Sequence, residues 1–106
     1  MYKLEYLPVA RRDMIEIVRY ISQELQNPTA ADQLAMELIE AGDSIPKFPY
    51  ANPAFIPIRP LKHEYRKLLV QNYFMFYWVD EVKKLVTVAR VVYARRDYER
   101  LLEREI

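Results

Sequence analysis

The sequence predicts an α+β fold of the order β-α-α-β-β-β, in which a helical hairpin packs on a mainly antiparallel twisted sheet and a short helix ends the chain. Three observations lead to this prediction. Two apolar stripes at helical spacing fill the first half of the chain, whereas the second half contains runs of Val, Leu, Phe and Tyr separated by short polar turns. Five of the seven prolines lie between the two halves. A chain of 106 residues is large enough for one core, so we expect a single domain over residues 1–106.

The N-terminal half predicts a strand followed by two helices. Residues 2–7 alternate between apolar and charged side chains, which is typical of a half-buried strand. Pro8 suits the first turn of a helix, and apolar residues then recur every three or four positions as far as residue 25. The pair Asn27-Pro28 disfavours helical geometry at Asn27, so Asn27 or Thr29 can cap a second helix, whose apolar stripe runs from Ala31 to Ile45. Two helices with so short a link are expected to lie antiparallel.

The proline-rich segment IPKFPYANPAFIPIRP is expected to form an ordered loop. Each proline ring fixes a φ angle, and Phe48, Tyr50 and Phe55 can anchor the segment on the rest of the molecule. The functional alternative is a PxxP ligand for a peptide-binding domain. The interleaved aromatic residues favour packing over that alternative.

Three strands are predicted in the second half, at Tyr65–Val70, Tyr73–Val79 and Leu85–Ala94. Gln71-Asn72 and residues 80–84 separate them and predict hairpin turns. The run YFMFYWV is apolar on both faces, so we expect an interior strand that the helical hairpin covers. The final segment DYERLLEREI predicts a short helix, which Asp97 can cap. Its apolar patch consists of Tyr98, Leu101 and Leu102.

Composition argues against several kinds of site. The only glycine is Gly42, so the chain cannot form the glycine-rich loops that bind nucleotide phosphates. The only histidine is His63 and there is no cysteine, which argues against zinc sites, disulfides and thiol or serine-relay catalysis. We therefore expect no metal and no small-molecule cofactor. No apolar run approaches the roughly 20 residues that span a bilayer, and the N-terminus lacks a signal-peptide pattern, so we expect a cytoplasmic protein without membrane contact.

The net charge of +1 conceals a strong segregation of charge along the chain. Residues 24–44 contain five acids and no base, residues 45–72 contain five bases and one acid, and residues 83–96 contain five bases and no acid. A basic stripe on a nearly neutral protein is typical of a surface that binds a polyanion or an acidic partner. The alternative is that these side chains only solubilise an exposed face.

Arg90 stands out because it interrupts a run of valines in the last predicted strand. Strand alternation places it on the same face as Val86 and Val88, and also on the same face as Arg96. A guanidinium keeps its charge in a protein, so a buried one needs a partner. We expect a structural ion pair, with the carboxylate supplied by Asp80, Glu81 or Glu64.

A candidate site lies where this strand ends. Arg95, Arg96 and Tyr98 follow it directly, and together they can hold a phosphodiester while the tyrosine stacks on a base or exchanges a proton. The neighbouring hairpin is expected to add basic residues so that guanidinium groups gather at a single rim of the sheet. The residues predicted to bind nucleic acid or a partner are Lys62, Arg66, Lys67, Arg95 and Arg96. The alternative is that Arg95 and Arg96 pair with Asp97, Glu99 and Glu103, while Tyr98 packs as a hydrophobic lid.

The order of elements, with the segments HEYRKLLVQNYFMFYWVDE and VTVARVVYARRDYERLL, resembles the RelE/ParE superfamily of toxins from bacterial type II toxin–antitoxin systems. The resemblance covers nearly the whole chain. It depends on a combination of positions in order, namely Tyr65-Arg66, Asn72-Tyr73, Tyr77, Val79-Asp80-Glu81, Arg90 and Arg95-Arg96-Asp97. It implies growth inhibition or plasmid stabilisation by a toxin that a cognate antitoxin silences. The basic sheet face and the groove beside the helices are expected to receive the antitoxin's amphipathic, partly acidic tail.

The resemblance implies one of two targets. RelE-like members cleave mRNA in the ribosomal A site without a metal, using a basic cluster, whereas ParE-like members poison DNA gyrase and need no nuclease site. Arg66 and Arg96 match two positions of the basic cluster, and Tyr98 lies close to that of the terminal tyrosine or histidine. Leu68 and Phe74 occupy two further positions that are usually basic.

The missing charges favour the gyrase target. One preorganised donor to an oxyanion is typically worth about 3–4 kcal/mol in the transition state, so a nuclease without two of them is expected to be feeble. The sequence therefore favours a ParE-like toxin that binds and poisons gyrase. The first alternative is a ribosome-dependent mRNA endoribonuclease with Arg66, Arg96 and Tyr98 as catalytic residues. The second alternative is a non-toxic nucleic-acid-binding remnant.

Overall fold

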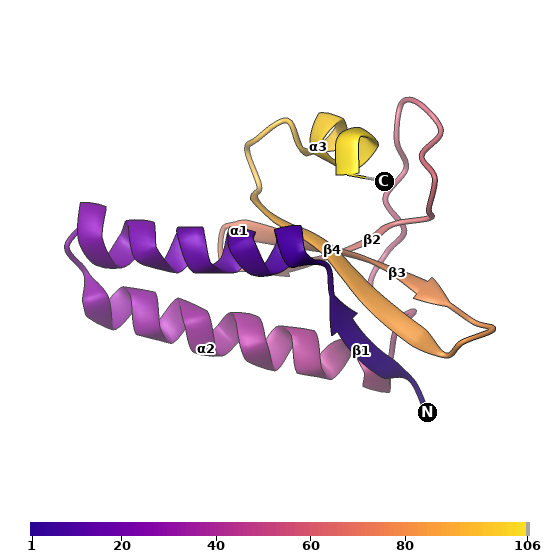
Figure 1. The fold of residues 1–106 in the computed structure, drawn as a ribbon, viewed down its shortest axis with the longest axis horizontal. Coiled ribbons are helices and arrows are strands. Elements are labelled where there is room, and N and C mark those ends of the chain that lie inside the picture. The colour runs from indigo at the N-terminus through magenta and orange to yellow at the C-terminus, as the bar shows by residue number, and fades with distance from the viewer. Residues whose placement is uncertain (106) are drawn as a thin grey trace.

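The computed structural model describes residues 1–105 and confirms the predicted α+β architecture (Figure 1). The sheet has the strand order β1-β4-β3-β2, with β1 parallel to β4 and the other neighbours antiparallel. Among these residues, no helix is long and apolar enough to cross a membrane. The elements in chain order are β1 (Lys3–Tyr6), α1 (Pro8–Arg19), a π-helical turn (Tyr20–Glu24), α2 (Pro28–Ser44), a 3-10 turn (Ile45–Lys47), β2 (Arg66–Val70), β3 (Tyr73–Asp80), β4 (Leu85–Tyr93) and α3 (Tyr98–Glu105).

The helical hairpin begins and turns as the sequence predicts. Pro8 lies in the first turn of α1, where its missing N–H costs no hydrogen bond. The helix continues into the π-helical turn, which closes with the Leu25 N–H donating to the Tyr20 carbonyl at 3.1 Å. Asn27 then caps α2, because its side-chain oxygen accepts from the Ala30 N–H at 3.2 Å. The two helices therefore lie side by side and antiparallel, as Figure 1 shows.

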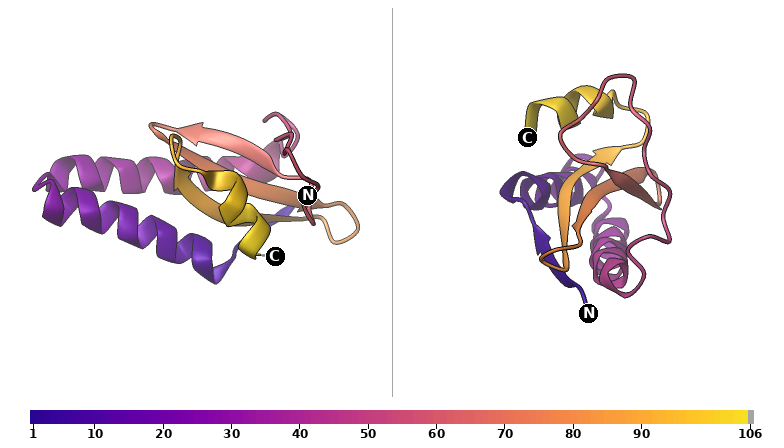
Figure 2. Two further views of the ribbon diagram at one scale, coloured as in Figure 1. Left: turned by 90° about the horizontal axis from the view of Figure 1, so that it is seen from above. Right: turned by 90° about the vertical axis from the view of Figure 1, so that its right-hand side faces the viewer.

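The sheet separates two layers, which Figure 2 shows from two further directions. The hairpin covers one face, where its apolar stripes meet alternate residues of β3 and β4. The later part of the proline-rich loop, which includes Phe55, covers the other face together with α3. The buried residues on the hairpin side are Ala10, Leu34, Leu38, Ile45, Val70, Met75, Tyr77, Val86, Val88 and Val91. Those on the other side are Tyr65, Phe76, Ala89, Val92 and Leu102.

Gly42 lies inside α2, where glycine costs about 1 kcal/mol relative to alanine. The structure supplies the reason for a glycine there. The ring of Tyr6, which comes from β1, packs directly against it, so that a Cβ atom at position 42 would lie 3.1 Å from the Tyr6 Cζ and would overlap the Tyr6 hydroxyl oxygen. The sole glycine of the chain therefore lets the sheet and α2 approach each other.

Arg90 is buried and paired as predicted, but the predicted partners are wrong. Asp13 of α1 accepts from Arg90 Nε at 2.7 Å and from a terminal nitrogen of the same guanidinium at 2.9 Å. One of its oxygens also accepts from the Val91 N–H at 3.0 Å. Asp80 instead accepts from the Lys83 N–H in the β3–β4 turn. An ionised carboxylate that receives three N–H groups satisfies a buried guanidinium well, and it ties α1 to the centre of β4.

A β-bulge in β4 alters the predicted alternation of side chains. Phe76 pairs with Arg90 whereas Tyr77 pairs with Val88, so Ala89 is an extra residue on β4. After the bulge the faces are exchanged, and Val91 packs on the hairpin side with Val88. The prediction that even-numbered residues of β4 share one face is therefore wrong beyond Val88. Asp13 accepts the Val91 N–H, two residues after Ala89.

The proline-rich loop is ordered against the sheet, as predicted. The Phe55 N–H donates to the Tyr65 carbonyl at 2.7 Å, and the Tyr77 hydroxyl donates to the Pro49 carbonyl at 2.7 Å. The ring of Phe55 lies in edge contact with Phe76, at a centroid distance of 5.8 Å. Phe48 differs from the prediction, because 73% of its surface is exposed.

Candidate functional site

The predicted basic residues do not gather at one rim of the sheet. Arg66 begins β2 and pairs with Tyr77, whereas Val70 at the other end of β2 pairs with Tyr73. Tyr73 in turn pairs with Tyr93, the last residue of β4, and Arg95 and Arg96 follow that residue. Four residues of β2, or about 13 Å at about 3.3 Å per residue, therefore separate Arg66 from the end of the sheet where Arg95 and Arg96 lie. The expectation of a single rim is wrong.

Arg66 holds the proline-rich loop on the edge of the sheet. One terminal nitrogen donates to the Asn52 carbonyl at 2.7 Å, and the guanidinium carbon lies 4.8 Å from the centroid of the Tyr50 ring. Its other terminal nitrogen is 3.6 Å from the carboxylate of Glu64, and 18% of the side chain remains exposed. Arg66 therefore has internal partners on three sides, and a structural role accounts for its position.

Lys67 and Tyr98 lie together on the opposite face of the sheet from Arg66. The Lys67 ammonium is 4.6 Å from the centroid of Phe74 and 5.8 Å from that of Tyr98. Tyr98 also packs against Phe55 and Phe76, at centroid distances of 5.6 and 5.0 Å. The ring of Tyr98 thus covers the sheet, in agreement with the alternative that it packs as a hydrophobic lid. The ammonium gains a cation–π contact with the same aromatic group.

The other predicted basic residues, Lys62, Arg95 and Arg96, are exposed. Two of the three acids proposed as partners of the two arginines, Glu99 and Glu103, contact the proline-rich loop instead. One oxygen of Glu99 accepts from the N–H groups of Ile58 and Arg59, at 2.9 and 3.3 Å, and Glu103 lies 4.0 Å from the Arg59 guanidinium. These contacts join α3 to the loop.

The strongest shifts in pKa occur around Glu81 of the β3–β4 turn. Glu81 accepts hydrogen bonds from Lys84, Tyr50 and Tyr2, and these bonds lower its pKa to about 2. The same carboxylate raises the pKa of Tyr50 to about 12. All these groups are exposed, so the shifts describe a surface network that ties the N-terminal strand and the loop to the turn.

His63 stacks flat on Trp78 beside this loop, with ring centroids 3.8 Å apart. Burial lowers the pKa of His63, with the charge of Lys62 acting in the same direction, which favours the neutral ring in this stack. Over residues 1–105, no group of three or more His, Cys, Asp or Glu is placed to hold a metal ion.

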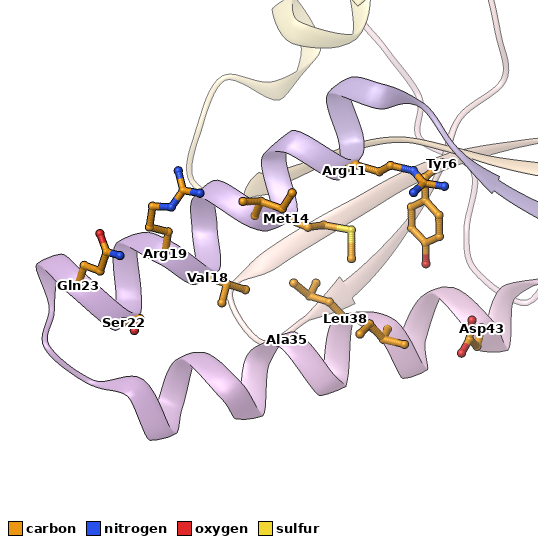
Figure 3. A pocket seen from close by; sticks show the side chains of 12 residues that line it. Tyr6, Arg11, Met14, Val18, Arg19, Ser22, Gln23, Ala35, Leu38 and Asp43 are labelled. Atoms are coloured by element: carbon orange, nitrogen blue, oxygen red, sulfur yellow. The ribbon is translucent and has the colours of Figure 1, made fainter.

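A groove with a volume of about 710 Å³ lies between α1 and α2 (Figure 3). Its floor is apolar and consists of residues whose side chains point toward the opposite helix, such as Met14, Val18 and Leu38. Ser22 and Gln23 of the π-helical turn line the end far from the sheet. The complete lining is Tyr6, Arg11, Met14, Ile15, Val18, Arg19, Ser22, Gln23, Ala35, Leu38, Ile39 and Asp43.

Exposed hydrophobic side chains flank the groove. They were not part of the apolar stripes that predicted the buried faces of the two helices. We call these side chains the shoulders of the groove. Ile15 on α1 and Ile39 on α2 are 56% and 55% exposed, and Met36 next to Ile39 is 63% exposed. A sequence signal was present, because these three residues widen the apolar stripes beyond what one buried helix face needs. At the sheet end, burial and the nearby Asp43 carboxylate raise the pKa of the Tyr6 hydroxyl.

Comparisons with known proteins give one family match and several structures of similar fold. A family model described as the ParE toxin of the type II toxin–antitoxin system parDE matches residues 4–98. The fold is similar to the chromosomal ParDE system from P. aeruginosa, with a TM-score of 0.72 and 15% identity over 90% of this chain and 98% of that chain. It is also similar to the RelBE2 toxin–antitoxin complex from Mycobacterium tuberculosis, with a TM-score of 0.58 and 17% identity over 87% and 96% of the two chains.

The intact E. coli RelBE toxin–antitoxin complex is a further similar structure, with a TM-score of 0.53 and 22% identity over 91% of this chain and 100% of that chain. At these identities the three structures show a shared fold. A search of curated proteins gave no match.

Proposed function

Because the chain belongs to the ParE toxin family of type II toxin–antitoxin systems, we propose that this toxin binds and poisons DNA gyrase and does not act by cleaving RNA. The observation that carries the proposal is the dispersal of the basic residues. Arg66 lies about 13 Å along the sheet from the end where Arg96 lies, and its guanidinium is engaged by Asn52 and Tyr50.

Cleavage of RNA without a metal needs several cationic groups around one phosphate, because charge develops on the phosphorane and the leaving group. Leu68 and Phe74 supply no charge, and the ring of Tyr98 is packed among aromatic side chains. A toxin that acts by binding needs no such cluster, so the arrangement favours gyrase as the target. Gyrase works on cytoplasmic DNA, and we propose that the toxin acts there.

A cognate antitoxin is the second partner in this proposal, in keeping with the toxin–antitoxin complexes of similar fold. The groove between α1 and α2 fits an amphipathic helix, since it combines an apolar floor with exposed shoulders such as Ile15 and Ile39. An antitoxin segment that orders on binding would cover these side chains and remove them from water.

Purified toxin and gyrase test the proposal directly. The toxin is expected to inhibit supercoiling or to trap cleaved DNA, and the variant Tyr98→Phe is expected to keep both this effect and growth inhibition, because the ring still packs without its hydroxyl. A ribosome-dependent cleavage assay is run in parallel with wild type, Arg96→Ala and Tyr98→Phe. Absence of any effect on gyrase at toxin excess would remove the proposal, and cleavage of translated mRNA that Arg96→Ala or Tyr98→Phe abolishes would replace it with the ribonuclease.

One observation supports the ribonuclease as the second candidate. The Lys67 ammonium lies 5.8 Å from the centroid of the Tyr98 ring, and Arg96 precedes that tyrosine by two residues. A cation and a phenol so close together form a reduced version of the cluster that general acid–base cleavage requires. In that case Lys67→Met is expected to abolish mRNA cleavage while leaving the fold intact.

A further inference from the structure

The two sides of the groove between α1 and α2 carry opposite charge. On α1, the lining residues Arg11, Ile15 and Arg19 follow one another at intervals of four, so two guanidinium groups flank one exposed apolar side chain. On α2, the exposed Ile39 is followed at the same spacing by the exposed Asp43. We call these two rows the basic rim and the acidic rim.

The sequence of α2 extends the acidic rim toward the far end of the groove. Asp32 and Met36 are exposed and lie seven and three residues before Ile39, which places them on the same side of the helix. α2 contains four acids and no base. Because the helices are antiparallel, Arg11 and Asp43 both lie at the sheet end of the groove, on opposite helices, and Arg19 lies toward the π-helical turn at the other end (Figure 3).

The dimensions fit a helix of about three turns. The lining on α1 extends from Arg11 to Gln23, which is about 18 Å at about 1.5 Å per residue. A helix that places an apolar stripe on the groove floor presents one flank to each rim. The flank beside α1 meets Arg11 and Arg19, and the flank beside α2 meets Asp43.

We infer that the partner segment is an amphipathic helix with an acidic flank and a basic flank on either side of its apolar stripe, and that the opposite charges of the two rims admit it in one direction only. This inference rests on the proposed docking of an antitoxin segment in the groove. Reversing the direction of the bound helix exchanges its flanks, so the reversed helix would place acid against Asp43 and base against Arg11. Like charges placed opposite each other disfavour that arrangement, which is how charged rims confer specificity.

Three helical peptides of equal length and identical apolar stripe test this inference. One has an acidic and a basic flank, one has two acidic flanks and one has two basic flanks, and each is stapled on its solvent face so that helicity does not differ. Binding to the whole toxin is measured by fluorescence anisotropy. The mixed peptide is expected to bind about fivefold tighter or more than either of the others. This preference is expected to shrink at high salt, because the Debye length falls from about 10 Å at 0.1 M to about 3 Å at 1 M.

Charge reversal on the rim provides the matched comparison. Arg11→Glu and, separately, Arg19→Glu are expected to shift the preference toward the peptide with two basic flanks, because each substitution cancels the net positive charge of the basic rim and places a carboxylate on it. Arg12→Glu reverses the neighbouring charge on the same helix outside the groove lining and is expected to leave the order unchanged. Circular dichroism of each variant confirms that it is folded. Equal binding of all three peptides to wild type, or an order that Arg11→Glu and Arg19→Glu leave unchanged, would overturn the inference.

The antitoxin separates the failure of this inference from the failure of the proposed docking. If the purified antitoxin binds wild-type toxin, and Arg11→Glu weakens it no more than Arg12→Glu does, the charge rule is wrong while the docking proposal stands. If the antitoxin protects none of the groove residues from hydrogen exchange or chemical labelling in the complex, the docking proposal is wrong as well.

A spin label tests the direction of the bound peptide. Because the chain contains no cysteine, a label on a single introduced cysteine, Gln23→Cys, can report which terminus of the mixed peptide lies at the end of the groove far from the sheet. Equal broadening of both peptide termini would contradict a single direction.

Discussion

The region around the proline-rich loop and the helical hairpin use their polar side chains in different ways. Arg66 at the start of β2 and Glu99 in α3 have internal partners that hold the loop. On the helical hairpin, Arg11 and Arg19 are exposed along the groove beside the half-exposed Ile15. The sequence suggested binding or catalytic roles for basic residues of the first region, yet the fold itself uses Arg66 to hold the loop. Side chains that the fold does not use are the better candidates for binding a partner, and substitutions should therefore separate stability from binding.

The largest effect on stability is expected at Asp13, which joins the hairpin to the sheet. Asp13→Ala leaves the buried Arg90 guanidinium without its carboxylate and the Val91 N–H without its acceptor. Removal of one partner of a buried ion pair typically costs about 3–5 kcal/mol, and urea denaturation measures the free energy of unfolding. The control Glu16→Ala changes an exposed acid on the same helix and should remain within about 0.5 kcal/mol of wild type. A similar small change for Asp13→Ala would contradict the role given to the pair.

Arg66 and Arg96 test whether the basic residues differ as the geometry indicates. Arg66→Ala removes the hydrogen bond to the Asn52 carbonyl and the contact with Tyr50, and it is expected to cost about 1.5–3 kcal/mol. Arg96→Ala removes an exposed side chain and is expected to change the free energy of unfolding by less than about 0.5 kcal/mol. Thermal denaturation of both variants measures the difference. Equal losses in the two variants would show that the two arginines are not distinguished by the fold.

A smaller effect is expected at Gly42. The added methyl group of Gly42→Ala overlaps the Tyr6 hydroxyl, and overpacking of this kind costs about 1–3 kcal/mol, against which the higher helix propensity of alanine returns about 1 kcal/mol. Tyr6→Phe removes the overlapping oxygen. The double variant Gly42→Ala/Tyr6→Phe is therefore expected to be more stable than Gly42→Ala alone. A double-mutant cycle with no coupling between the two positions would contradict this account.

The Glu81 network predicts a weak dependence of stability on pH. The folded-state pKa of Glu81, about 2, lies below its ordinary value of 4.5, so the contribution of its contacts is present above pH 4.5 and is lost as the pH falls toward 2. The folded-state pKa of Tyr50, about 12, lies above 10, so its contribution is present below pH 10 and is lost as the pH rises toward 12. Both groups are exposed, so the effect is small. Denaturation at several pH values should give shallower slopes in both windows for Glu81→Gln, and unchanged slopes would count against the network.

The smallest effect on stability is expected in the groove, where binding should change instead. Ile39 is 55% exposed, so Ile39→Ser should change the free energy of unfolding by less than about 0.5 kcal/mol. The same substitution removes an apolar shoulder that the proposed antitoxin helix covers, and affinity measured by calorimetry is expected to fall by about tenfold or more. Ile56→Ser, at an exposed isoleucine in the proline-rich loop, is the matched control. Equal affinities of the two variants for the antitoxin would place the interface elsewhere.

Much of the fold could be predicted because helix and strand patterns are local in sequence. The hairpin stripes, the Asn27 cap, the three later strands and the ordered proline-rich loop depend on residues within a few positions of one another. The position of Arg90 within a run of valines also predicted a buried, paired guanidinium. The family resemblance came from residues of the predicted strands and the segments next to them.

The candidate site was predicted less well, because it depends on which residues meet across the chain. Arg90 pairs with Asp13, 77 positions away, and no local pattern distinguishes that carboxylate from Asp80 or Glu81. One extra residue in β4, Ala89, exchanges the faces of all later residues in the strand, and periodicity alone cannot place such a bulge. Sequence by itself determined the elements and their order. Only the tertiary structure decided that Arg66 and Arg96 lie apart and that α1 and α2 leave a groove with rims of opposite charge, since partner choice and exposure are properties of packed elements.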